Sequence, residues 1–477
     1  MSGESLAQLL FEHPAPHDEV LAYDNCTQLT GAQMRRAADD LASELQAAGV
    51  RPGDPVVLQV PNSVDAVVAM IAIWRAQAVF VPLNHRSPAA EREHVLKSVP
   101  AVAIVDGNGV APLGGTPQHF DPEIAFVTWT SGTTGPPKAI LHTHDGYFEL
   151  LDRVLKNLKP TNGNPAQAGP PNLVPVPLAL NSGIYNVLFG LRAGRALVIM
   201  DRFSTAEFAD VVYRFGITST VLPPAAIAML TEDAAISNLK PLKFVRSITA
   251  PLPPPVARSF YERFGVFVLN GYGQAEIGEV IGWTGADARN HPEKVGAAGR
   301  PHPGVHIKIV DAGRGEVPAG EVGQLIVRPP KLAAGFASGE GLGERIDSEG
   351  FVATGDLARI DEDGFVWITG RMGEVIVRGG NKVYPGEVED ILCLSPAVAE
   401  AAVIAAPDDR LGEVPVAFIV NAADASPASD ADLTALCRDS LVSYKVPTAF
   451  HRVTELPRND IGKIRRAELT KRLAGLQ

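Results

Sequence analysis

The residues from Thr130 to Lys138 have the types and spacing best suited to hold a polyphosphate. The segment reads Thr-Ser-Gly-Thr-Thr-Gly-Pro-Pro-Lys and follows an apolar, β-like run from Ile124 to Trp129. Its glycines allow a tight loop whose N–H groups converge on phosphate oxygens, while hydroxyls add donors and Lys138 adds a cation. The segment does not have the Gly-x4-Gly-Lys-Ser/Thr spacing of a Walker A phosphate-binding loop. Clusters of glycine, serine, threonine and proline are also common in solvated turns, so both interpretations stay open.

A second segment, Asn270 to Glu276, reads Asn-Gly-Tyr-Gly-Gln-Ala-Glu and follows a predicted strand over residues 266–269. Two glycines let a ligand approach the backbone of a strand-end loop. The ring of Tyr272 offers a face for a base, and the Glu276 carboxylate is a hard oxygen ligand for Mg²⁺. Taken alone, the pattern is more typical of a glycine turn with a surface glutamate.

Three later segments are also weak when taken singly. In Ala353-Thr354-Gly355-Asp356-Leu357 an aspartate at a glycine turn suits both hydroxyls of a ribose, but an Asx turn explains it equally. Residues 370–389 predict a hairpin that leads into a helix. Residues 457–466 are basic, and such runs are usually solvated.

The elements that must position these segments alternate between strand and helix. A helical period over residues 30–50 begins at Thr30 as N-cap and stops at Gly49. A Val-rich strand over 56–60, a helix over 64–76 and a buried strand over 79–83 follow, and similar alternation recurs around 197–230. This order indicates parallel sheets covered by helices. Residues 300–370 predict a β-rich subdomain, and mixed elements after Arg371 predict a second domain.

Composition narrows the classes of function. The 477 residues are too many for one core, 46 % are apolar, and the net charge is −12. An acidic surface argues against nucleic acid as a partner. Three widely spaced cysteines favour a reducing cytosol, and no secretory signal or membrane span is expected.

Together, the order and spacing of these segments resemble the adenylate-forming superfamily of acyl- and aryl-CoA synthetases, adenylation domains and firefly luciferase. The resemblance covers nearly the whole chain, including Val60 to Ser63, Val81 to Asn84 and Glu321 to Arg328. It implies an α/β fold: a large N-terminal domain of layered α/β subdomains with a β-rich subdomain, over residues 1–371. A small, mobile α+β domain is expected over residues 372–477.

The resemblance implies an AMP-forming acid–CoA ligase that uses ATP, Mg²⁺ and CoA. A carboxylate attacks the α-phosphate of ATP, pyrophosphate leaves, and a thiol then takes the acyl group from the adenylate. Lys463, Glu276 and Lys138 would be catalytic, with Glu276 on the metal, Tyr272 against adenine, and Asp356 with Arg371 on the ribose. The implied ATP-binding residues are Thr130, Ser131, Gly132, Thr133, Thr134, Gly135, Lys138, Ala250, Asn270, Gly271, Tyr272, Gly273, Asp356, Arg371 and Lys463.

Members of the superfamily rotate the small domain between the two half-reactions. One face of the small domain would bring Lys463 to the active site for the first half-reaction. The other face would bring Arg378, Gly379 and Gly380 to the CoA tunnel for the second. Gly373 stands at the hinge, where relatives carry Asp or Lys. Glycine permits wide backbone travel, so rotation is expected to persist.

The acid substrate is the least constrained part of the prediction. The residues expected at its pocket are Leu180, Asn181, Ile184, Gly271 and Ile277, which suggest an apolar pocket for an aryl or aliphatic acid, or plain core packing. Asn181 cannot pair with an α-ammonium, so an amino acid is disfavoured. Ala275 replaces the threonine usual before the motif glutamate.

Two alternatives to the CoA ligase remain. One is a stand-alone adenylating enzyme that loads a separate acyl-carrier protein; free CoA is favoured because the sequence ends without a carrier domain. The other is a degenerate nucleotide-binding protein, which the joint presence of Lys138, Glu276, Asp356, Arg371 and Lys463 disfavours. A cytoplasmic enzyme without nucleic-acid or integral membrane association is expected, and its oligomeric state is open.

Overall fold

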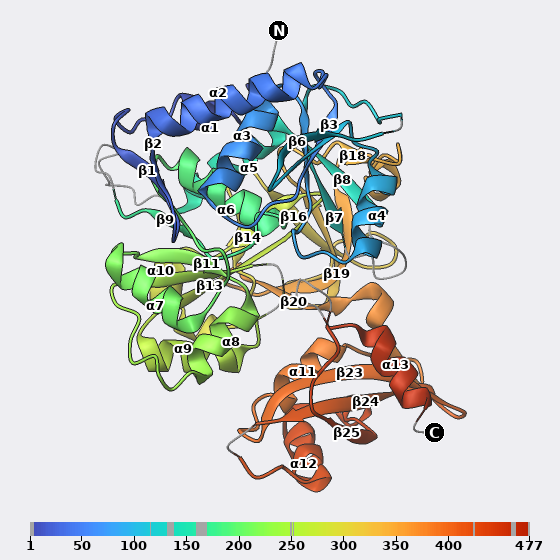
Figure 1. The fold of residues 1–477 in the computed structure, drawn as a ribbon. Coiled ribbons are helices and arrows are strands. Elements are labelled where there is room, and N and C mark those ends of the chain that lie inside the picture. The colour runs from blue at the N-terminus through green and yellow to red at the C-terminus, as the bar shows by residue number, and fades with distance from the viewer. Residues whose placement is uncertain are drawn as a thin grey trace.

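The computed structural model describes residues 4–114, 116–130, 138–158, 169–248, 250, 252–422, 425–458 and 464–475. A large α/β part extends to the end of β20 (Val366–Arg371), and a smaller α+β part follows it. Figure 1 shows the smaller part, in orange and red, set against one end of the large part. Among the described residues the strands form four sheets, three in the large part and one in the small part. The predicted fold class is confirmed.

One sheet of seven strands has the order β18-β8-β7-β4-β3-β5-β6. Its parallel centre is built from Val-rich strands that are buried on both faces, as the sequence predicted for 56–60 and 79–83. The strands are β3 (Pro55–Leu58), β4 (Val79–Pro82), β5 (Ala103–Asp106), β6 (Gly109–Pro112), β7 (Ile124–Thr130), β8 (Lys138–Thr143) and β18 (Gly335–Phe336). Strands β7 and β8 pair antiparallel, so Lys138 lies opposite Thr130 at one end of the sheet.

A second sheet of nine strands has the order β15-β14-β13-β12-β11-β9-β10-β1-β2. Its strands are β1 (Val20–Tyr23), β2 (Gln28–Thr30), β9 (Asn172–Val174), β10 (Leu197–Ile199), β11 (Ser219–Leu222), β12 (Phe244–Ser247), β13 (Phe267–Gln274), β14 (Gly278–Gly282) and β15 (Arg300–Pro301). The strands from β1 through β13 along this order run parallel, and β14 and β15 extend the sheet antiparallel. The carboxyl ends of the parallel strands therefore meet at one edge, where open α/β sheets bind ligands.

Helices cover these two sheets, with α2 and α3 packed together on one side (Figure 1). The helices of the large part are α1 (Gln8–Phe11), α2 (Gly31–Ala47), α3 (Val64–Arg75), α4 (Ala89–Ser98), α5 (His144–Leu158), α6 (Asn181–Arg192), α7 (Thr205–Arg214), α8 (Pro224–Glu232), α9 (Pro254–Phe264) and α10 (Gly285–Asn290). The predicted N-cap of α2 is confirmed, because Thr30 and Gln33 form a capping box. Gly49, just beyond the helix, has a φ of 92°, which explains the glycine there.

The β-rich subdomain predicted over 300–370 is a four-stranded antiparallel sheet in the order β16-β17-β19-β20. Its strands β16 (His306–Val310), β17 (Gly323–Arg328) and β19 (Val352–Ile360) pack one face on Ile277, Val280 and Ile281. This apolar layer joins the four-stranded sheet to the hairpin of β13 and β14. It therefore brings Asp356 on β19 close to the Tyr272 segment, although the two are far apart in sequence.

The small part pairs its strands in the order β22-β21-β24-β23, with β25 beside β24. Its elements are β21 (Ile376–Arg378), β22 (Asn381–Val383), α11 (Pro385–Leu392), β23 (Val398–Asp408), β24 (Gly412–Asn421), α12 (Asp430–Ser440), β25 (Ala449–Val453) and α13 (Arg466–Ala474). The predicted hairpin is confirmed: Arg378 pairs with Asn381 across Gly379 and Gly380, whose φ values are 55° and 84°. A two-residue hairpin turn of type I′ requires a positive φ at both central residues, and glycine adopts this conformation without strain.

Candidate active site

The segment from Asn270 to Gln274 lies at the carboxyl edge of the nine-stranded sheet. The sequence predicted a loop here, and that prediction was wrong: β13 runs on through Gln274 and pairs antiparallel with β14. Gly273 shows why glycine misled the prediction, since a Cβ there would lie 2.1 Å from the carbonyl oxygen of Gly278. The glycine allows two backbones to approach closely within a hairpin, and it does not end the strand.

Asp356 and Arg371 face each other across β19 and β20 as direct cross-strand partners. Arg371 Nε lies 3.0 Å from Asp356 Oδ1, and the Asp356 side chain is buried. The predicted glycine turn at Gly355 is therefore also wrong, because the residue lies inside β19. The register of the hairpin explains why residues separated in sequence form an ion pair, and burial strengthens that pair.

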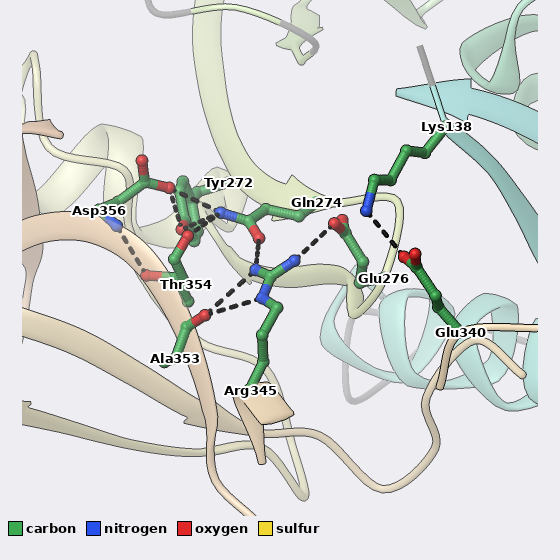
Figure 2. Close-up of polar contacts among 9 residues, drawn as sticks. All are labelled: Lys138, Tyr272, Gln274, Glu276, Glu340, Arg345, Ala353, Thr354 and Asp356. Atoms are coloured by element: carbon green, nitrogen blue, oxygen red, sulfur yellow. Dashed lines mark hydrogen bonds and ion pairs between the residues drawn. The ribbon is translucent and has the colours of Figure 1, made fainter. Parts of the chain in front are cut away.

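Two side chains of β13 donate to the other carboxylate oxygen of Asp356. The Tyr272 hydroxyl lies 2.6 Å from Oδ2, and Gln274 Nε2 lies 2.8 Å from it (Figure 2). Burial, and next the negative charge of Asp356, raise the pKa of Tyr272 well above its usual value, so the phenol stays a donor. The structure thus brings three predicted site residues, Tyr272, Asp356 and Arg371, to one place.

Arg345 joins this group to Glu276, and sequence reasoning missed it. Its Nη1 donates to Glu276 Oε1 at 2.7 Å and its Nη2 to Gln274 Oε1 at 3.1 Å, while the Ala353 carbonyl also accepts (Figure 2). Gln274 can therefore accept from Arg345 with its oxygen while it donates to Asp356 with its nitrogen. Arg345 ends a single 3-10 turn (Gly343–Arg345) between Gly-rich segments, where no periodicity marks a functional side chain.

Lys138 starts β8 and lies on the same side as Glu276 in Figure 2. Its Nζ is 2.8 Å from Glu340 Oε2, and both side chains are more than half exposed. Glu340 and Arg345 belong to one stretch that follows β18, so this stretch contacts both Lys138 and Glu276 with side chains of opposite charge. Residues 131–137 of the predicted phosphate loop lie outside the described residues, as does the side chain of Thr130.

A small cavity of about 30 Å³, open to solvent, adjoins the Glu276 segment through Ala275 and Ile277. Of the residues predicted for the acid pocket, Asn181 and Ile277 line it, whereas Leu180, Ile184 and Gly271 do not. Ile184 is fully buried in the main core. The lining mixes apolar residues with polar side chains, which are those of His142, Thr143, Tyr147, Arg153, Asn181 and Lys331.

The remaining predicted ATP contacts lie around the same edge. Asn270 donates its amide to the carbonyl of Ala297 at 3.2 Å, so that side chain is engaged with the backbone. Gly271 keeps space beside the Glu279 carboxylate, which a Cβ would approach to 3.1 Å. Ala250 is half-buried, and both its chain neighbours lie outside the described residues.

In the small part, Lys463 lies outside the described residues, and the chain resumes just before α13. Arg466, at the start of α13, pairs with Glu389 of α11 and donates to Glu374 at 3.0 Å. Glu374 directly follows Gly373, so the predicted hinge and the segment after Lys463 are linked by an ion pair. Arg378 donates to the carbonyls of Tyr444 and Val446, and Gly379 and Gly380 form the turn described above.

In the part of the chain that the structure describes, no His, Cys, Asp or Glu residues gather in threes with the geometry of a metal site. The sequence predicts a single metal ligand, Glu276, and its side chain is 10 % exposed. This fits a cation such as Mg²⁺, which is commonly bound through one or two carboxylates and substrate phosphates. No helix among these residues has the length and apolarity needed to traverse a bilayer.

Comparison with known proteins identifies the family. The model of the family described as AMP-binding enzyme matches residues 11–116 and 114–337, and the model of its C-terminal domain matches residues 387–463. The 4-coumarate–CoA ligase 5 of Oryza sativa subsp. japonica is 32 % identical over 91 % of this chain and 87 % of its own. A fatty acid–[acyl-carrier-protein] ligase, ScoC of Streptomyces coeruleorubidus, is 29 % identical over 94 % of this chain and 92 % of its own.

Among solved structures, the anthranilate CoA ligase AuaEII in complex with anthranoyl-AMP is similar over 99 % of this chain and 98 % of its own. Its TM-score is 0.87, and 25 % of the residues are identical. Both family models match in the order expected for the large and small parts. The chain therefore belongs to the AMP-binding enzyme family, the adenylate-forming family that its motifs resemble.

Proposed function

We propose that the protein is an ATP-dependent carboxylic acid–CoA ligase that works through an acyl-adenylate. An oxygen of the acid attacks the α-phosphorus of ATP, and the bond to the bridging oxygen of pyrophosphate breaks. The CoA sulfur then attacks the acyl carbon, its proton is released, and AMP leaves with the carboxyl-derived oxygen. CoA ligases among the relatives, and a similar structure that holds an acyl-AMP, confirm this reaction class.

One observation carries the assignment of the nucleotide site: a continuous polar network runs from Arg371 through Asp356, Gln274 and Arg345 to Glu276. Figure 2 shows this network from Asp356 to Glu276. The network lies at the carboxyl edge of a parallel sheet, where nucleotides bind in open α/β folds. One end suits a ribose, because Asp356 presents buried carboxylate oxygens to hydroxyl donors. The other end, at Glu276, suits the metal that accompanies the phosphates.

The first step must offset repulsion between two anions, the acid and the triphosphate. Fixed cations and N–H groups aimed at the developing charge do this with little reorganisation. Lys138 would neutralise pyrophosphate, and Lys463 would contact the acid carboxylate and the ATP oxygens. Bound through Glu276, Mg²⁺ would supply further charge neutralisation at the phosphates.

The second step needs a different face of the small domain at the same site. We infer a domain boundary at residues 371 and 372, with Gly373 as the pivot. Gly373 lies in a short 3-10 turn (Met372–Glu374), without a left-handed φ, and a Cβ there would meet nothing within 4 Å. This conformation does not itself require glycine, which supports a requirement in a second conformation. The turn of Gly379 and Gly380 would then line the path of the CoA arm.

A second acceptor, an acyl-carrier protein, is favoured by one observation. The relative ScoC, named a fatty acid–[acyl-carrier-protein] ligase, matches nearly the whole chain. The adenylation step is common to both acceptors, so the network above does not choose between them. We infer a cytoplasmic enzyme, in line with three cysteines that form no disulfide.

The acceptor is tested by supplying a panel of acids with ATP and Mg²⁺, and then either CoA or a phosphopantetheinylated carrier protein. We expect acyl-CoA together with AMP and pyrophosphate in equal amounts. Acyl transfer to the carrier protein alone would replace CoA as the acceptor. AMP and pyrophosphate without either thioester would show that the second half-reaction is wrongly assigned.

A further inference from the structure

The cavity beside Glu276 has a charged residue at its buried side, and the proposed function leaves this residue without a role. Arg153 lines the cavity, and its side chain is 2 % exposed. It belongs to α5, where Gly146, Leu150 and Arg153 share one helix face because they are spaced by four and three residues. That face forms one wall of the cavity.

The guanidinium of Arg153 has few hydrogen-bond acceptors in its buried position. Its Nε and Nη1 are buried and have no hydrogen-bond acceptor, and Nη2 reaches only the carbonyl of Ile277, at 3.5 Å. Buried arginine donors are normally paired, and each unpaired one needs a physical explanation. A guanidinium can donate two parallel hydrogen bonds to a carboxylate or a sulfonate, so an anion that enters the cavity would supply the missing acceptors.

The nearest counterion does not replace such an anion. Glu149 Oε2 lies 3.1 Å from Arg153 Nη1, one helical turn earlier, but the geometry is not that of a hydrogen bond and both atoms remain unsatisfied. Burial raises the pKa of the Glu149 carboxyl, while the nearby charge of Arg153 acts in the opposite direction. The other buried arginine nearby, Arg246, differs because Glu279 accepts from it with both carboxylate oxygens.

A glycine close to Glu276 leaves space for this guanidinium. Gly278, two residues after Glu276, has a φ of 66°, and a Cβ there would lie 3.2 Å from Arg153 Nη2 and 3.0 Å from Leu150. A second cation, Lys331, also lines the cavity, with its side chain 52 % exposed and paired with Asp145. Lys331 is thus paired at the exposed position, and the unmet hydrogen-bond donors of the cavity lining belong to Arg153 at the buried position.

We propose that Arg153 is an anion-binding residue of the acid pocket and that the substrate carries a second anionic group, a carboxylate or a sulfonate, besides the carboxylate that is activated. This inference rests on the proposed function. It changes the sequence-based expectation of an apolar pocket for a plain aryl or aliphatic acid. In this arrangement the reacting carboxylate would lie on the side of Ala275 and Ile277, and the second anion would lie against α5.

The test uses acids in pairs of matched size, measured by acid-dependent exchange of labelled pyrophosphate into ATP. The pairs are succinate with butanoate, glutarate with pentanoate, isophthalate with 3-methylbenzoate, and 3-sulfopropanoate with butanoate. In the wild-type enzyme we expect a higher kcat/KM for the dianionic member of at least one pair. Comparison of the succinate and 3-sulfopropanoate pairs distinguishes carboxylate from sulfonate.

Two variants change the ratio of dianionic to monoanionic kcat/KM in opposite directions. Arg153→Met removes the charge at similar size and should lower the ratio about 10- to 100-fold, the scale of one charge-assisted hydrogen bond in a buried site. Glu149→Gln removes the competing carboxylate and keeps Arg153, so the ratio should rise. If Arg153→Met does not fold, Glu149→Gln still carries the test, because a fall in its ratio would overturn the inference.

A purely structural role for Arg153 predicts a different result. Both variants would then lower the thermal midpoint, and the ratio would stay within about twofold of the wild type. That result, or a preference for the monoanionic acid in every pair, overturns the anion site but leaves acid–CoA ligation intact. No exchange with any acid overturns the proposed function itself, and the anion site with it.

Discussion

Replacing Arg345 by methionine tests whether the polar network of the proposed nucleotide site is held together as one unit. Arg345 donates to Glu276 at 2.7 Å and to Gln274 at 3.1 Å, and Gln274 in turn donates to Asp356 at 2.8 Å. Without the guanidinium, the Gln274 amide loses the acceptor role that fixes its orientation toward Asp356. Glu276 also loses the cation that holds one of its oxygens.

The size of the effect follows from these contacts. A hydrogen bond to a charged group contributes about 1.5–3 kcal/mol. The Arg345 side chain is 33 % exposed, so solvent screens the pair and the lower end applies. About 1.5 kcal/mol corresponds to a loss of roughly 10-fold in kcat/KM for ATP. Arg345→Lys should fall between the wild type and Arg345→Met, because an ammonium cannot reach three acceptors with a planar fork.

The Mg²⁺ dependence of the reaction should change in the favourable direction, opposite to the loss in kcat/KM for ATP. In Arg345→Met the Mg²⁺ concentration for half-maximal rate should fall, because Glu276 is no longer shared with a competing cation. The assay is pyrophosphate exchange with ATP and Mg²⁺ varied separately. Lys308→Met is the matched control, since it breaks an ion pair with Glu349 on the surface of the same β-rich sheet and should change neither value. Unchanged ATP and Mg²⁺ dependence in Arg345→Met would refute the role given to Arg345.

Three further predictions concern the proposed catalytic lysine, the proposed hinge and two buried histidines. Lys463→Ala should lose about 10²–10³ in adenylation rate, the scale of one transition-state donor, yet still form thioester from supplied acyl-adenylate; unaffected pyrophosphate exchange would show that the lysine is misassigned. Gly373→Pro should slow thioester formation much more than adenylation. Gly373→Ala should be tolerated in the present conformation, because a Cβ there meets no neighbour. Equal losses in both half-reactions for Gly373→Pro would count against the hinge. Burial lowers the pKa of His142 from 6.5 to about 3 and that of His144 to about 4, so both are neutral when folded and their stabilising contribution is complete above pH 6.5. It is lost as the pH falls from 6.5 through about 4 and 3, so the thermal midpoint should decline over that range and decline less steeply in His142→Gln; parallel slopes would contradict this.

The sequence was sufficient for the family and the fold class. Strand–helix alternation predicted the parallel sheets, and the motif around Tyr272 and Asp356 predicted residues that the structure brings within hydrogen-bond distance. Glycine was the main source of error, because Gly273 and Gly355 suggested turns. Both lie inside strands, where glycine at residue 273 is required by a close approach of two backbones.

The residues that sequence reasoning missed have no local signature. Arg345 lies in a short irregular segment, and its partners are distant in sequence, so only the packing of the β-rich sheet against β13 and β14 reveals the contact. Arg153 follows the helical period of α5 at a position that reads as part of a charged helix face. Only the fold shows that this side chain is buried beside the cavity, next to Gly278.

The most direct measurement of the central claim is acid-dependent exchange of labelled pyrophosphate into ATP in the absence of CoA. We predict exchange that requires both the acid and Mg²⁺, and that falls strongly when Asp356 is replaced by alanine, because the ribose then loses its buried acceptor. A protein that shows no exchange with any acid, or that exchanges equally well without Asp356, would contradict the assignment of this network as an adenylation site.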